Sequence, residues 1–156
     1  MSETKLDPIP QGFELLPLGL GFTDVIQPCY RKVADKTVLM GLRVEQQHCN
    51  MMGVCHGGVL MTLADITAAS GVNIVCGKSA GSPTLNLALD FISAGRKGQW
   101  LEASITQTTV KRRFGFCSGL ISNADGVVAR FNGTFYLPGH DGVWKVEKRK
   151  GGILGE

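Results

Sequence analysis

Residues 50–65 read NMMGVCHGGVLMTLAD, and this stretch decides how the chain of 156 residues folds. It opens with loop-forming asparagine and glycine and turns apolar after His56-Gly57-Gly58. Apolar residues then recur at the three- and four-residue spacing of a helix face, and further apolar residues fill the remaining surface. The first set is Val59, Leu60, Leu63, Ile66 and Ala69, and the second is Met61, Ala64, Ala68 and Val72. A helix apolar nearly all round is typically buried on nearly all sides, so we predict a central helix within residues 57–76.

Asp65 is the one acidic or basic residue between His56 and Cys76 apart from that histidine. A carboxylate buried in such a helix costs free energy unless it has partners. Carboxylates in such surroundings are candidates for acid–base or nucleophilic chemistry. The alternative is a purely structural carboxylate that accepts hydrogen bonds from neighbouring backbone groups.

The flanking segments alternate between apolar and polar residues and predict strands on both sides of the helix. Tight turns between strands demand antiparallel pairing, so we expect the strands after the helix to pair in this way and the helix to be the one crossover. The architecture is therefore α+β, with a single sheet curled around one helix over residues 22–137, after an irregular lead-in (1–21) and before a basic tail (138–156). The expected strands are Phe22–Tyr30 (interrupted by Pro28), Thr37–Val44, Thr84–Phe91, Trp100–Val110, Phe114–Ser122 and Val127–Leu137.

The pattern Asn50-x-x-Gly53-x-x-His56-Gly57-Gly58-x-x-x-x-Leu63-x-Asp65 closely resembles the signature of hotdog-fold acyl-CoA thioesterases of the phenylacetate-pathway (PaaI-like) type. The match is tight over these positions and extends over residues 22–137 by the pattern of strands. The resemblance implies a hotdog fold and hydrolysis of an acyl- or aryl-CoA thioester to the free acid and CoA. It also implies sites at a dimer interface and no metal or redox cofactor, since CoA is part of the substrate.

Gly57 and Gly58 lie at the expected helix start, where backbone N–H groups have no partner within the helix and the dipole is positive. An acyl carbonyl placed there would gain a donor as it becomes an oxyanion. The alternative is that both glycines only permit close packing of helix on sheet. By resemblance, the Asn50 amide helps to hold the thioester carbonyl, and the Thr84 hydroxyl orients the attacking water.

Asp65 follows Gly57 by eight residues, so the two lie ~12 Å apart along the helix axis. Groups that act on one carbonyl and its attacking water must come within hydrogen-bonding reach of them. We therefore predict a homodimer in which the helix start of one subunit faces Asp65 of the other. Whether Asp65 acts as general base or nucleophile, and whether dimers pair into tetramers, is open at this point.

For His56, which lies at the expected helix start, a structural role is favoured over direct catalysis. Neither a Cys55-His56 nucleophile nor a zinc site from His48, Cys49, Cys55 and His56 is favoured, because adjacent residues rarely present side chains to one another and the usual ligand spacings are missing. A second carboxylate, Asp90, stands near a strand end beside a basic turn and is expected at the surface.

CoA phosphates would require basic groups at the mouth of the cleft. The candidates all lie in predicted turns, where charged side chains are otherwise simply solvated. They are Arg96, Lys97, Lys111, Arg112 and Arg113.

Composition excludes several other classes. A net charge of +3 without a basic stripe argues against nucleic-acid binding. Five cysteines without paired spacing and a start lacking an apolar signal region predict reduced thiols in the cytoplasm. The 57–76 segment is long enough to span a membrane, but Asp65, Ser70 and Asn73 favour a helix covered by a sheet.

Two functional alternatives remain beside the thioesterase. A hotdog dehydratase would need a catalytic histidine with a carboxylate partner, which the His56-Gly57-Gly58 order and the lone Asp65 disfavour. A CoA-ester-binding protein without catalysis would share the fold, although a sensor of this kind normally carries an output domain.

Overall fold

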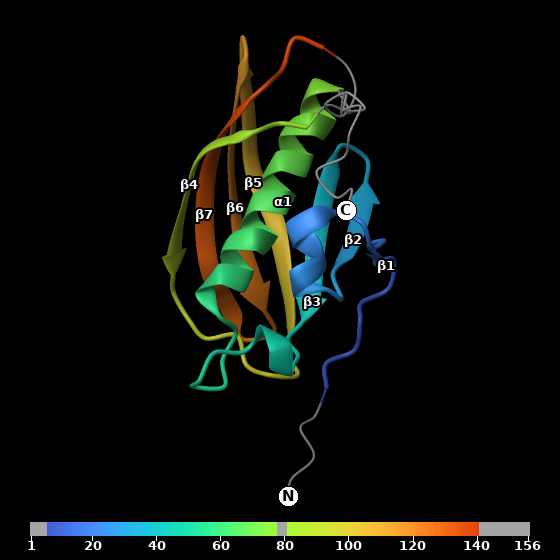
Figure 1. Ribbon diagram of the computed structural model, residues 1–156, viewed down its shortest axis with the longest axis vertical. Helices are drawn as coiled ribbons and strands as arrows, with labels where there is room; N and C mark the ends of the chain where they lie inside the picture. The colour runs from blue at the N-terminus through green and yellow to red at the C-terminus, as the bar shows by residue number, and fades with distance from the viewer. Residues whose placement is uncertain (1–5, 78–80, 141–156) are drawn as a thin grey trace, which may run out of the picture.

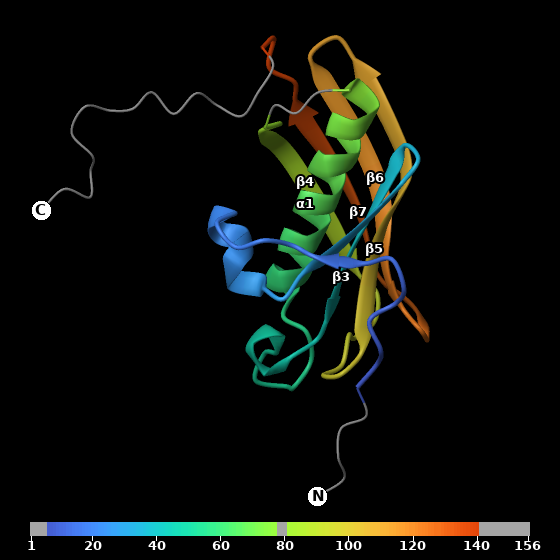
Figure 2. The ribbon, with the colours of Figure 1, turned by 90° about the vertical axis from the view of Figure 1, so that its right-hand side faces the viewer.

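The computed structural model describes residues 6–77 and 81–140 and contains one long helix packed along one face of a curved sheet (Figure 1). Figure 2 shows the same arrangement turned by 90° about the vertical axis. The sheet has seven antiparallel strands in the order β1-β2-β3-β5-β6-β7-β4. Element bounds are β1 Glu14–Leu15, η1 Gly21–Ile26, β2 Tyr30–Ala34, β3 Thr37–Arg43, η2 Gln46–His48, α1 Gly57–Cys76, β4 Thr84–Phe91, β5 Trp100–Lys111, β6 Phe114–Asn123 and β7 Gly126–Tyr136.

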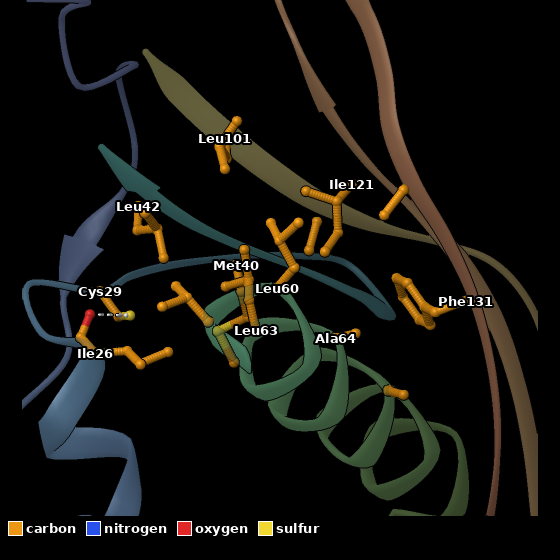
Figure 3. Packing of buried hydrophobic residues seen from close by; sticks show 14 of the residues in the cluster. Ile26, Cys29, Met40, Leu42, Leu60, Leu63, Ala64, Leu101, Ile121 and Phe131 are labelled. Carbon is orange, nitrogen blue, oxygen red and sulfur yellow. Dashed lines mark hydrogen bonds between the residues drawn. The ribbon is translucent and has the colours of Figure 1, made fainter. Parts of the chain in front are cut away.

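The predicted central helix is confirmed as α1, which ends where Gly77 takes a left-handed conformation. Its buried residues include Leu60, Leu63 and Ala64, and they point toward apolar side chains of the sheet (Figure 3). Side chains from several strands complete this core, among them Met40, Leu42, Leu101, Ile121 and Phe131. The α+β prediction of one antiparallel sheet on one helix therefore holds.

The apolar surface of the helix predicted burial on nearly all sides, but α1 is not buried all round. One face of α1 is fully buried, whereas Met61, Asp65 and Ile66 are only half-buried. Within one chain the sheet covers a single face of the helix, and this leaves the opposite face open. α1 is long and apolar enough to cross a membrane by length and composition, and its packing on the sheet accounts for the buried part of that apolar surface.

The predicted strand Phe22–Tyr30 is wrong. Residues Gly21–Ile26 form the 3-10 helix η1, which lies beside the first half of α1 (Figures 1 and 2), and the strand begins at Tyr30. The reason is local, because the Asp24 carboxylate accepts hydrogen bonds from the Gly19 and Leu20 N–H groups and closes a turn. The lead-in also contains β1, which pairs with β2.

The expected pairing of β4 with β5 is also wrong, because β4 pairs with β7 and lies at the edge of the sheet. The segment that connects β4 to β5 forms backbone hydrogen bonds with other parts of the chain. Ile92 and Ser93 donate to the Val128 carbonyl, and Gly98 donates to the Val44 carbonyl. The helix is therefore not the one crossover, and the outer edge of β4 is open.

Candidate active site

Asn50 organises the loop that leads into α1. Its Oδ1 accepts hydrogen bonds from the Met52 N–H (2.9 Å) and the Val54 N–H (3.4 Å). The Asn50 carbonyl accepts from Gly53, whose φ of 73° is readily adopted only by glycine. Because the side-chain oxygen serves the loop, the NH₂ group is the part of this amide that remains to donate.

The start of α1 presents one backbone donor. The His56 ring caps the helix, with its Nδ1 accepting from the Gly58 N–H at 2.8 Å. The Val59 and Leu60 N–H groups donate to the His56 carbonyl. No described residue accepts from the Gly57 N–H, so this group has the donor capacity expected of an unpaired helix start. Of the two predicted glycines, Gly57 thus presents a donor and Gly58 does not.

A cleft of about 390 Å³ opens at Gly57. Most of its lining is apolar and comes from the loop, the start of α1 and the end of β4, namely Val54, Cys55, Gly57, Leu60, Phe91, Ile92, Ser93 and Ala94. A Cβ added to Gly57 would lie 3.3 Å from the Phe91 ring, so glycine keeps the backbone accessible beside that ring. The cleft can therefore take an apolar group that carries a polar atom near Gly57.

Asp65 and Thr84 are brought together by the fold, although nineteen residues separate them. The Thr84 hydroxyl, at the first residue of β4, donates to Asp65 Oδ1 at 2.7 Å. Asp65 is half-buried and Thr84 is exposed, so the carboxylate is both partnered and open to water. This carboxylate–hydroxyl pair suits the activation of a water molecule.

The two halves of the site stay apart within one chain. Gly57 and Asp65 lie on the same unbroken helix, ~12 Å apart along its axis. Thr84, which contacts Asp65, is the first residue of β4, and Phe91, which lies beside Gly57, is its last residue. Both halves therefore lie along the flank of α1 beside the open edge strand.

The basic candidates divide between the two ends of α1, about 30 Å apart. Near the helix start, Arg96 forms a β-bridge with Val54, and Lys97 Nζ donates to Gln46 at 3.0 Å. At the other end, Arg112 and Arg113 line a hollow of about 300 Å³ that also includes Cys76.

Lys111 is the exposed last residue of β5 and belongs to the second group of basic candidates.

Asp90 is exposed as predicted and forms an ion pair with Arg130 at 2.6 Å. That pair lies away from the carboxylate–hydroxyl pair of Asp65 and Thr84.

A role for Cys55 as the catalytic nucleophile is disfavoured by its surroundings. Burial, together with the nearby Cys49, raises the pKa of the Cys55 thiol to about 12, so the thiol is protonated near neutral pH. A cysteine that attacks the substrate in every turnover needs a lowered pKa. No cluster of three or more metal-ligating side chains occurs among residues 6–77 and 81–140.

His48 and Phe91 belong to the site's framework; the sequence suggests His48 only as a disfavoured zinc ligand and Phe91 not at all. The His48 ring is fully buried, with Nδ1 accepting from Glu45 and Nε2 donating to the Ile26 carbonyl. These bonds tie η1 to the loop before Asn50. The capping-box spacing of Glu45 and His48 was the available signal.

Comparison with known proteins agrees with the fold. A family model described as the thioesterase superfamily matches residues 52–142, more than half of the chain. The chain belongs to the thioesterase superfamily, whose architecture is the hotdog fold. A protein of Pseudomonas aeruginosa named "Putative esterase PA0474" is 32% identical over 133 residues, which is 83% of this chain and 98% of that protein.

Solved structures extend the likeness in fold. The PaaI protein from the phenylacetic acid degradation operon of E. coli is 24% identical, with a TM-score of 0.65, over 74% of this chain and 82% of that one. A hypothetical thioesterase from Streptococcus pneumoniae, solved with coenzyme A, is 20% identical, with a TM-score of 0.67, over 83% of this chain and 98% of that one.

Proposed function

We propose that this protein is an acyl-CoA thioesterase that hydrolyses an acyl- or aryl-CoA to the free acid and CoA. One observation carries the proposal, namely that Gly57, whose N–H has no acceptor among the described residues, lines an apolar cleft, while a carboxylate with a hydroxyl partner, Asp65 with Thr84, lies on the same helix. The superfamily and the CoA-bound structural relative support the same reaction class.

The residues divide the chemistry between them. The Gly57 N–H and the Asn50 NH₂ group donate to the thioester oxygen as it gains negative charge. Asp65 either takes a proton from water as that water attacks the carbonyl carbon, or attacks the carbon itself. The C–S bond then breaks, and the CoA sulfur leaves and ends as the thiol.

A dimer would join the two halves of the site. The open edge of β4 carries exposed apolar residues in and beside it, with Leu85 at 56%, Phe91 at 57% and Ile92 at 55% exposure. Antiparallel pairing of β4 with its copy across a two-fold axis would place the Thr84 end of one strand beside the Phe91 end of the other. Asp65 of one subunit would thereby approach Gly57 of its partner, in a dimer or in a tetramer of such dimers.

The dehydratase alternative has less support from the geometry. A catalytic histidine with a carboxylate partner would use both ring nitrogens, one for the substrate and one for the carboxylate, whereas His56 Nδ1 is occupied by the helix cap at Gly58. Within residues 6–77 and 81–140, no hydrogen bond or ion pair connects His56 to a carboxylate.

The test is a hydrolysis screen of the full chain over short, medium, long and aryl CoA esters, read by the CoA thiol that is released. At least one ester should reach kcat/KM on the order of 10⁴ M⁻¹s⁻¹ or more, the lower end for enzymes on their own substrates. Release no faster than with the Asp65→Asn variant, for every ester, would exclude the proposed reaction.

Thr84→Val should lower kcat by roughly 10- to 100-fold, the equivalent of a lost hydrogen bond to a charged group at about 1.5–3 kcal/mol. Valine keeps the shape of threonine but cannot donate to Asp65. KM and Tm should stay near wild type, because Thr84 is an exposed positioning residue. Thr84→Ser, which keeps the hydroxyl, is the matched control and should restore most of the rate. Wild-type kcat in Thr84→Val would remove Thr84 from the mechanism.

A further inference from the structure

Cys49 and Cys55 face each other across the short hairpin that carries Asn50. They form an isolated antiparallel bridge. Two backbone hydrogen bonds flank the pair, from the Asn50 N–H to the Val54 carbonyl and from the His56 N–H to the His48 carbonyl, each 2.8 Å. This pattern defines a non-hydrogen-bonded pair, the position at which opposite side chains come closest.

The geometry of such a pair suits a disulfide. Cα atoms lie about 4.5 Å apart in a non-hydrogen-bonded pair, and disulfides span about 4.4–6.8 Å between Cα atoms. The two side chains leave the hairpin on the same face, because they are directly opposed, and both pack against the hydrophobic core. The other cysteines belong to different parts of the fold, namely Cys29 before β2, Cys76 at the end of α1 and Cys117 in β6.

We propose that Cys49 and Cys55 form a reversible disulfide on exposure to hydrogen peroxide and that this bond switches the site off. The Cys49 sulfur attacks a peroxide oxygen and breaks the O–O bond, which gives a sulfenic acid and releases the other oxygen as water. The Cys55 sulfur then attacks the Cys49 sulfur, and the sulfenic oxygen leaves as a second water with the Cys55 proton. Two thiols thus supply the two electrons that reduce one hydrogen peroxide.

Burial sets the order of these steps. Cys49 is half-buried and can meet a small oxidant, whereas Cys55 is only 6% exposed. Burial, with a further contribution from Cys49, also raises the pKa of the Cys55 thiol to about 12, which makes it the poorer first nucleophile. Cys55 therefore acts as the resolving thiol.

The Cys49–Cys55 disulfide would act on the site through the residues that follow each cysteine in the chain. Asn50 directly follows Cys49, and His56 directly follows Cys55. Cβ atoms must approach to about 3.8 Å in a disulfide, from about 4.5–5.5 Å in the open pair, and this pulls the two sides of the hairpin together. A misplacement of about 1 Å costs on the order of 10² in rate, so the oxidised protein should hydrolyse thioesters far more slowly. This consequence rests on the proposed function.

The experiment treats the full chain with hydrogen peroxide and follows thiols, mass and hydrolysis together. Free thiols should fall from five to three as two are consumed, and the intact mass should fall by two hydrogen atoms. A peptide map under non-reducing conditions should contain Cys49 linked to Cys55. Hydrolysis should fall at least tenfold in step with the linked peptide, and a dithiol reductant should restore both.

Two variants make the test specific. Cys49→Ser should form no disulfide within the chain and should keep its hydrolysis rate under the same treatment. Cys76→Ser, the matched control at another thiol, should respond like wild type. A disulfide at another pair, oxidation without a disulfide, or a Cys49–Cys55 disulfide that leaves hydrolysis unchanged would each overturn the proposal. If the chain hydrolyses no thioester at all, the proposed function fails separately, because thiol count and map still report the disulfide.

Discussion

Asp65→Asn should lower kcat by about 10²–10⁴ if Asp65 is a general base, and by more if it is the nucleophile. The substitution keeps the shape of the side chain and leaves an oxygen that can still accept from the Thr84 hydroxyl. It removes the negative charge that, in the proposed mechanism, activates water or attacks the acyl carbon. Steady-state hydrolysis of the best CoA ester measures the loss, with substrate binding and Tm followed in parallel.

Asp90→Asn is the matched control, because Asp90 is a second carboxylate next to the same cleft-forming strand end. Its ion pair with Arg130 is exposed on both sides and should contribute little to stability. Hydrolysis should be unaffected by this change. If Asp65→Asn instead unfolds the protein, or leaves kcat intact, Asp65 is a structural carboxylate.

The two possible roles of Asp65, general base and nucleophile, differ in where the oxygen atom of the attacking water ends up. In a single turnover in oxygen-18-labelled water, a general base delivers the label directly to the acid product. A nucleophile forms an anhydride whose hydrolysis can leave the label in the Asp65 carboxylate. Mass analysis of the peptide that contains Asp65 separates the two.

Asn50→Ala should lower kcat by roughly 10²–10³, the usual loss for one donor to an oxyanion. KM should change little, because the interaction strengthens mainly in the transition state. The same substitution also removes Oδ1, which accepts from Met52 and Val54, so some loss of Tm is expected as well.

Asn50→Asp separates the two roles of this side chain. It keeps an oxygen for the loop hydrogen bonds but replaces the donating NH₂ group with a second acceptor. Tm should therefore stay close to wild type while kcat falls at least as far as in Asn50→Ala. Near-normal turnover in Asn50→Asp would assign Asn50 to loop architecture alone.

The sequence predicted the features that follow from periodicity. The run of apolar residues around Leu63 specified α1, and alternation specified β3 and the three strands β5 to β7. The family pattern also led to Thr84, which the fold places against Asp65. These predictions succeeded because side-chain spacing within one segment reports directly on its structure.

The predictions that failed concerned features that depend on contacts between segments. The turn signals between β4 and β5 say nothing about which strand pairs with β4, so its place beside β7 was missed. The half-burial of Asp65 follows from how much of α1 one sheet can cover. The loss of the Gly58 donor follows from the ring orientation of His56, which local sequence does not specify.

In the proposed dimer, Asn50 and Gly57 of one subunit act with Asp65 of the other. Mixing Asn50→Ala chains with Asp65→Asn chains tests this arrangement directly, with subunit exchange confirmed by native mass spectrometry. A mixed dimer then holds one site with both residues intact and one with both changed, so hydrolysis should return toward half of the wild-type rate per mixed dimer. If the residues act within one subunit, every site stays damaged, and mixed dimers that recover no activity would contradict the account.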